Sequence, residues 1–94
     1  MTRVELTELA RQDLDFLIRT RELPATTYDR VEEMLDQLRG FPLTGQTVDG
    51  RYPGARFTVV AWGWLGLLYH YLESDDLVLV VALYDGRTRG APHP

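Results

Sequence analysis

Two stretches in the N-terminal half repeat their apolar positions at the spacing of an amphipathic helix. In the first stretch the apolar residues of one helical face are Leu6, Ala10, Leu14, Leu17 and Ile18. Thr7 offers a hydroxyl for the N-cap of this helix, and Pro24 ends it, because the residue before a proline is disfavoured in helical geometry. This pattern predicts a helix that begins after Thr7 and buries one side.

The second stretch has apolar residues at intervals of three and four, namely Tyr28, Val31, Leu35 and Leu38. Thr26 or Thr27 is the predicted N-cap, and Gly40 is the predicted left-handed residue at the C-terminus. Two amphipathic helices with a short connection predict an antiparallel hairpin, and each helix needs an apolar surface to cover.

The remaining pattern is that of β-strands. Residues 4–6 alternate as a short strand, and residues 56–61, 65–72 and 77–84 predict an antiparallel meander. Residues 41–55, which contain three glycines and two prolines, predict a loop. Residues 77–84 are apolar at both alternating sets of positions, which predicts a central strand covered by the helices on one face and by the C-terminal tail or a partner on the other. The expected architecture is a single α+β domain over residues 1–94, in the order β-α-α-β-β-β.

Composition narrows the classes of function. The chain has no cysteine, no apolar run long enough to cross a membrane and no secretory signal pattern, so the cytoplasm is the expected location. The net charge of −4 lies entirely in residues 1–50, which hold six Arg against ten Asp and Glu. An acidic half repels phosphate, so any nucleic-acid surface should lie in the C-terminal half and be small, and sequence-specific DNA binding is not expected.

Three stretches together resemble the RelE/ParE toxins of bacterial type II toxin–antitoxin pairs. They are residues 6–14 (LTELARQDL), residues 38–43 (LRGFPL), and the strand meander, which contains Gly54-Ala55-Arg56, residues 67–71 (LLYHY) and residues 80–83 (VVAL) with Arg87 beyond. The resemblance implies a helical hairpin packed on a mainly antiparallel sheet. It also implies a toxin that a cognate antitoxin neutralises. RelE-like toxins cut mRNA in the ribosomal A site, whereas ParE-like toxins poison DNA gyrase.

The chain carries only part of the set of nuclease residues that the resemblance implies. Cleavage of RNA by its 2′-hydroxyl needs a base, an acid and cations near the phosphate. Arg56 and Arg87 match family positions, and His70 or Tyr84 could transfer protons. The basic residue that the family carries in its middle strand, however, would fall at or beside Gly66, which cannot stabilise charge. His70 also has a simpler interpretation as a packing residue on an apolar strand face. An enzyme is therefore the less favoured interpretation.

Other positions are candidates for protein contacts. Target-binding candidates are Arg87, Arg89, Trp62 and Trp64, and antitoxin-binding candidates are Leu14, Leu17, Tyr28 and Leu35. Core packing explains the tryptophans equally well, and solubility explains the arginines. No cofactor is expected, and no metal-ligand spacing is present. Three hypotheses follow: a ParE-like gyrase inhibitor, a RelE-like endonuclease, and a non-toxic interaction protein of the same fold.

Overall fold

The computed structural model describes residues 2–48 and 53–88. Its elements in chain order are β1 (Arg3–Leu6), α1 (Glu8–Thr20), α2 (Thr26–Gly40), β2 (Gln46–Thr47), β3 (Arg56–Ala61), β4 (Leu65–Leu72), the 3₁₀ turn η1 (Glu73–Asp75) and β5 (Leu77–Asp85). The predicted α+β class and order of elements are confirmed, with one addition. The short strand β2 lies within the segment that was predicted to be a loop throughout.

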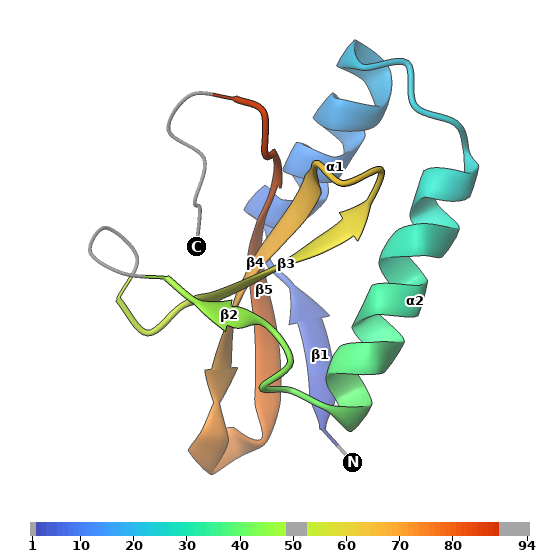
Figure 1. Cartoon of the computed structure of the whole chain (residues 1–94). Helices are drawn as coiled ribbons and strands as arrows, with labels where there is room; N and C mark the ends of the chain where they lie inside the picture. The colour runs from blue at the N-terminus through green and yellow to red at the C-terminus, as the bar shows by residue number, and fades with distance from the viewer. Residues whose placement is uncertain (1, 49–52, 89–94) are drawn as a thin grey trace.

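The strands form one five-stranded sheet in the order β1-β5-β4-β3-β2 (Figure 1). β1 pairs with β5 in parallel, from Arg3 beside Leu77 to Leu6 beside Val80, and every other neighbouring pair is antiparallel. The parallel pair is possible because the two helices connect β1 to the rest of the sheet. β5 therefore lies inside the sheet, as its two-sided apolar sequence predicted.

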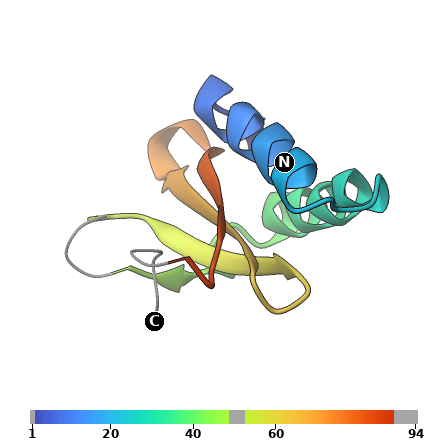
Figure 2. The same cartoon turned by 90° about the horizontal axis from the view of Figure 1, so that it is seen from above.

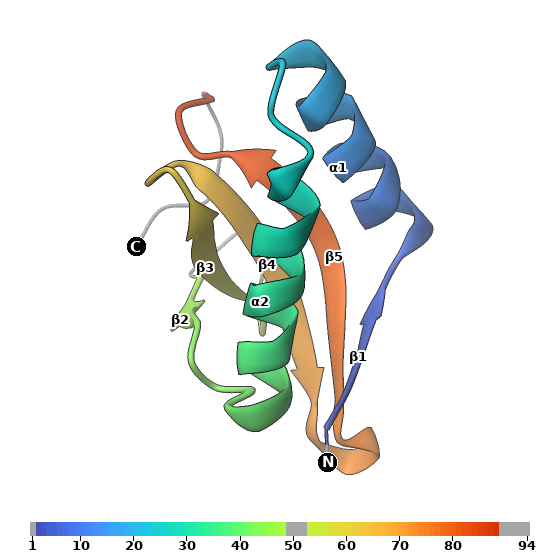
Figure 3. The same cartoon turned by 90° about the vertical axis from the view of Figure 1, so that its right-hand side faces the viewer.

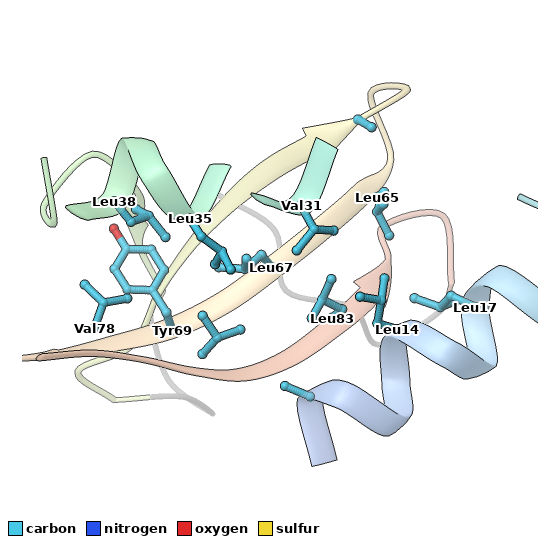
Figure 4. Packing of buried hydrophobic residues seen from close by; sticks show 13 residues of the cluster. Leu14, Leu17, Val31, Leu35, Leu38, Leu65, Leu67, Tyr69, Val78 and Leu83 are labelled. Atoms are coloured by element: carbon cyan, nitrogen blue, oxygen red, sulfur yellow. The ribbon is translucent and has the colours of Figure 1, made fainter. Parts of the chain in front are cut away.

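Both helices cover the same face of this sheet (Figures 2 and 3). α1 packs on β5, and α2 contacts β3 and β1. Figure 4 shows the core between helices and sheet, whose buried members are Ala10, Leu14, Leu17, Val31, Leu35, Leu38, Ala61, Leu65, Leu67, Tyr69, Val78, Val80 and Leu83. The opposite face of the sheet is called the helix-free face below.

The N-cap predicted for α1 is confirmed, whereas the N-cap predicted for α2 is not. Thr7 caps α1 as predicted, because its Oγ1 accepts a hydrogen bond from the Ala10 amide at 3.1 Å. The prediction for α2 is wrong, since Ala25 is the N-cap and has no side-chain cap. Thr27 lies inside the first turn and is fully buried, one turn before Val31. Gly40 is the last helical residue and does not adopt a left-handed conformation.

A second, smaller cluster lies on the helix-free face. Val48 and Ala55 pack against Phe57 and Leu68, next to partly buried residues of β5. Sequence reasoning assigned the cover of this face to the C-terminal tail or a partner. In the described part of the chain, Val48 and Ala55, at the two ends of the connection between β2 and β3, supply part of this cover. The tail beyond residue 88 lies outside the described residues.

A β-bulge in β5 changes which residues face the helices. Leu68 pairs with Ala82 and Tyr69 pairs with Val80, so Val81 is the extra residue. Before the bulge Val78 and Val80 are buried under the helices, and after it Leu83 and Asp85 are buried. A bulge shifts the alternation of a strand by one position. Tyr84 consequently lies on the helix-free face, and Asp85 lies on the helix side.

β5 is longer than β1, and α1 supplies hydrogen-bonding partners to the part of the β5 edge that β1 does not reach. The Thr7 amide donates to the Val80 carbonyl at 3.0 Å. Further along, the Leu83 amide donates to Oδ2 of Asp13 at 3.2 Å, so a helix side chain replaces the missing strand. Burial raises the pKa of Asp13, and the hydrogen bond from Leu83 opposes that shift. Asp13 thereby joins α1 to the sheet.

Replacement of Asp13 by Ala should lower the free energy of unfolding by about 1–3 kcal/mol, because the Leu83 amide would lose its partner at a partly buried edge. Urea denaturation followed by circular dichroism measures the change. Gln12→Ala is the matched control, since this neighbouring side chain is exposed and should alter stability by less than about 0.5 kcal/mol. Equal effects of the two variants would contradict the proposed role of Asp13.

Candidate functional site

The turn between β3 and β4 holds a tryptophan in an uncommon backbone conformation. Trp62 has φ 54° and Gly63 has φ 73°, and the Trp64 amide donates to the Ala61 carbonyl at 3.2 Å. Positive φ at both central residues of a four-residue β-turn, here residues 61–64, is the mark of a type I′ turn. Asn, Asp and Gly are the usual residues there, and a bulky side chain at positive φ is rare.

Aromatic and guanidinium groups gather at this turn. The ring centroids of Trp62 and Trp64 are 6.0 Å apart. Cζ of Arg30, from α2, lies 5.9 Å from the Trp62 ring centroid, and Cζ of Arg87 lies 3.9 Å from the Trp64 centroid. We call these four residues the aromatic tip. Trp64 is partly buried against the main core, whereas 41% of Trp62 is exposed, so the two tryptophans do not share one role.

Asp85 fixes the position of Arg87. Its carboxylate accepts hydrogen bonds from Nε of Arg87 at 3.0 Å, from Nη2 of Arg87 at 2.9 Å and from Nε of Arg21 at 3.1 Å. Asp85 is 5% exposed, and the Arg87 guanidinium holds the pKa of the Asp85 carboxyl well below its usual range. The sequence predicts Arg87 as a catalytic and target-binding candidate. In the structure its guanidinium is already bound to a buried carboxylate and stacked on an indole.

Arg56 faces the helix side of the sheet. Nη1 of Arg56 donates to the Gly45 carbonyl at 2.7 Å and to the Leu43 carbonyl at 3.3 Å. Its partner on β4 is Tyr69, which is fully buried in the main core and whose hydroxyl donates to the Pro42 carbonyl at 2.8 Å. Arg56 therefore holds the segment that follows α2 against the sheet.

Tyr84 occupies the space above Gly66 on the helix-free face. A Cβ added at Gly66 would lie 2.4 Å from Cζ of Tyr84, which is far closer than such atoms approach. No larger side chain fits at Gly66 while Tyr84 holds this position. Burial also raises the pKa of Tyr84 to about 12, so its phenol is protonated at neutral pH.

The four predicted catalytic residues do not converge. His70 and Tyr84 share the helix-free face, but Tyr84 is paired with Gly66, which precedes His70 on β4 by four residues, or roughly 13 Å of strand. Arg56 lies on the other face, and Arg87 is bound at the Asp85 end. One phosphate group could not contact all four. Arg89 lies outside the described residues.

Burial also revises the predicted antitoxin contacts. Leu14, Leu17 and Leu35 are at most 6% exposed, because their helical stripe packs on the sheet and not outward. Tyr28 is exposed, with its hydroxyl 3.1 Å from Oδ1 of Asp15, and its contact with a partner stays a prediction. The exposed large apolar residues that the sequence did not predict as contacts are Leu9, Phe16, Phe41, Leu43, Val59 and Leu72. For Leu9 and Phe16 the available signal is their position outside the apolar stripe of the first helix.

Phe41 and Leu43 line an open pocket of about 570 Å³ after α2. Its other lining residues are Gly40, Pro42, Thr44, Tyr71 and Glu73. Across residues 2–48 and 53–88, no three His, Asp or Glu side chains are grouped so that they could hold a metal ion. Within the same residues, neither helix has the length and apolar character needed to cross a membrane.

Comparison with known proteins identifies the fold. No family model and no curated protein sequence matches the chain. Among solved structures, the YoeB/ParE toxin from Agrobacterium tumefaciens is similar with a TM-score of 0.71 and 15% identity, over 89% of this chain and 98% of that one. A chain of the intact E. coli RelBE toxin–antitoxin complex is similar with a TM-score of 0.68 and 14% identity, over 90% and 96%.

The isolated E. coli RelE toxin is similar with a TM-score of 0.67 and 14% identity, over 96% of this chain and 89% of that one. The chain therefore has the fold of the RelE/ParE superfamily of toxins, as the sequence resemblance implied. At identities near 15% the likeness is one of fold.

The contact between Gly66 and Tyr84 can be tested by a double-mutant cycle. Gly66→Ala should destabilise the protein by about 1–3 kcal/mol, because the new methyl group overlaps the Tyr84 ring. In a Tyr84→Ala background the same change should cost at least about 1 kcal/mol less. Chemical denaturation of the four proteins measures both values. Strict additivity would show that the ring does not lie over Gly66.

The ion pairs of Asp85 predict the acid sensitivity of the fold. Because the folded-state pKa of Asp85 is depressed, its stabilisation is complete above about pH 5 and is lost as pH falls below the unfolded-state pKa toward the folded-state value. Asp85→Asn should lower stability at pH 7 by about 1.5–3 kcal/mol. It should also flatten the loss of stability between about pH 5 and pH 2.

Unfolding measured at several pH values compares Asp85→Asn with the wild type. Asp13 has a raised pKa and acts in the opposite direction, but it is present in both proteins and its effect cancels in the difference. Asp75→Asn, at an exposed turn position, is the control and should follow the wild-type profile. A profile of Asp85→Asn parallel to that of the wild type would contradict the role of the ion pairs.

Proposed function

We propose that this chain is the toxin of a type II toxin–antitoxin pair and that it acts, like ParE, by binding a protein target, with DNA gyrase as the first candidate. Its fold supports the toxin assignment. The similar structures include a RelBE toxin–antitoxin complex and a RelE variant in complex with an antitoxin RelBc peptide, the latter with a TM-score of 0.65 and 15% identity over 87% of this chain and 80% of that one.

The main observation that favours binding over cleavage is that the four candidate nuclease residues lie apart from one another. Arg56 binds backbone carbonyls on the helix side, and Arg87 binds Asp85. The position that would supply a cation in the middle strand is Gly66, beneath Tyr84. A proton-transferring pair without a cation beside the phosphate lacks the main source of transition-state stabilisation for this reaction.

The charge of the helix-free face supports the same choice. Within the described strands, strand register places one arginine on this face, Arg3, at the edge of the sheet. Its Nη1 lies 3.9 Å from Oε2 of Glu5, which offsets its charge. The centre of the face is apolar, with Phe57 and Leu68 packed against Val48 and Ala55. Such a surface offers little attraction to a phosphate backbone.

A cognate antitoxin is part of the proposal, and its contacts are reassigned to exposed apolar residues. Phe41 and Leu43 are 72% and 59% exposed beside the pocket after α2, and Leu9 and Phe16 are exposed on α1. Apolar side chains of this size in solvent are typical of surfaces that an extended or helical segment covers. We place the action of the pair in the cytoplasm, where a gyrase target lies.

Induced expression of the wild type and of a His70→Ala/Tyr84→Phe variant tests the mechanism. Both proteins should slow growth equally, because neither side chain contributes to target binding in this mechanism. Supercoiling assays with purified gyrase and primer extension on cellular mRNA then separate the targets. Inhibited supercoiling with intact mRNA is the expected result for both proteins.

A RelE-like nuclease would give the opposite result. Removal of an acid or a base typically costs 10²–10⁴-fold in rate, so the double variant would lose its effect on growth and the wild type would cleave A-site codons. Normal growth on expression of the wild type would favour the non-toxic interaction protein. A co-expressed candidate antitoxin should restore growth if the pairing is correct.

A further inference from the structure

The conformation of Trp62 works against the stability of the turn that contains it. A type I′ turn favours Asn or Gly at its first central position, since these residues adopt positive φ readily. Trp62 has φ 54° and a bulky side chain in that position. Residues held in such conformations are concentrated at sites of function.

Packing accounts for only part of the indole of Trp62. Trp64, two residues later, is the tryptophan that packs against the main core. Trp62 is 41% exposed, and its ring lies beside the partly buried Trp64 ring and the exposed Arg30 guanidinium. A side chain of this size and exposure, in a disfavoured backbone conformation, is better explained by a contact outside the chain.

Contacts within the chain hold the aromatic tip in place. Arg87 lies over Trp64 and is held by two hydrogen bonds to the buried Asp85, which Arg21 of the α1 C-terminus also binds. Trp64 in turn contacts Trp62. A pre-positioned aromatic anchor loses little conformational entropy on binding, which is the property of the residues that dominate protein interfaces.

The charges at the tip favour a protein partner over a nucleic acid. Arg87 and Arg21 already donate to Asp85, which leaves Arg30 as the cation beside Trp62. Within the described residues no carboxylate lies within ion-pair distance of Arg30. A single-stranded nucleic acid needs a groove of several cations along its backbone. One cation beside one exposed indole is complementary to a partner protein that has an apolar pocket with a carboxylate at its rim.

We infer that Trp62 is the anchor with which the protein docks onto its target protein, and that Arg30 pairs with an acidic residue at the edge of the pocket that receives the indole. This inference rests on the proposed function, because it names the surface through which the toxin binds its target. It assigns Arg87 a positioning role. The ion pair with Asp85 holds Arg87 over Trp64, and Trp64 in turn supports Trp62, the anchor.

Trp62→Asn tests the inference, because it removes the indole and gives the turn its preferred residue. We expect a melting temperature equal to or a few degrees above that of the wild type, together with loss of growth inhibition. We also expect affinity for purified DNA gyrase to fall at least about 30-fold, the loss typical of an interface anchor. Leu72→Asn is the control, since it removes a similarly exposed apolar side chain (37% against 41% for Trp62) outside the tip and should retain wild-type binding to gyrase.

Other results would overturn the inference in distinguishable ways. Wild-type growth inhibition by Trp62→Asn would refute the anchor and leave the proposed toxin function intact. A marked fall in melting temperature would show that the indole serves packing. Loss of binding to a single-stranded RNA oligonucleotide, with gyrase binding unchanged, would exclude a protein partner at the tip. If the wild type itself neither slows growth nor binds gyrase, the proposed function fails, and the anchor fails with it.

Discussion

The structure depends on burial of β5 on both of its faces. Val78, Val80 and Leu83 pack beneath the helices, while Val81 and Ala82 border the smaller cluster on the opposite side. An inner strand of this kind needs hydrogen-bonding neighbours on both edges, because its backbone groups have no access to water. β4 supplies one edge. β1 and then α1, through Asp13, supply the other.

The same strand determines the chemistry at the end of the sheet. The bulge at Val81 turns Asp85 toward the helix side, where Arg21 and Arg87 bind it. It turns Tyr84 toward the helix-free face, where its ring covers Gly66. A single extra residue thus helps to position the aromatic tip and also places the Tyr84 ring over Gly66.

Local pattern predicted the elements well, and it predicted the site less well. The boundaries of β3 and β4 and the cap of α1 followed from alternation and from the Thr7 hydroxyl, which are properties of neighbouring residues. The two-residue strand β2 carries no pattern of its own and exists only because β3 is beside it. Thr27 has the chemistry of a cap, but its place on the buried side of α2 turned it inward.

The α+β class, the order of helices and strands, the two-sided apolar strand β5 and a turn between two tryptophans follow from the amino-acid sequence, because they depend on spacing along the chain. The sequence alone could not show that Arg56 faces the helices, that Asp85 binds Arg87, or that Trp62 alone of the tryptophan pair is exposed. The face on which a side chain lies depends on strand register and on bulges. Those are set by partners distant in sequence, and strict alternation cannot reveal them.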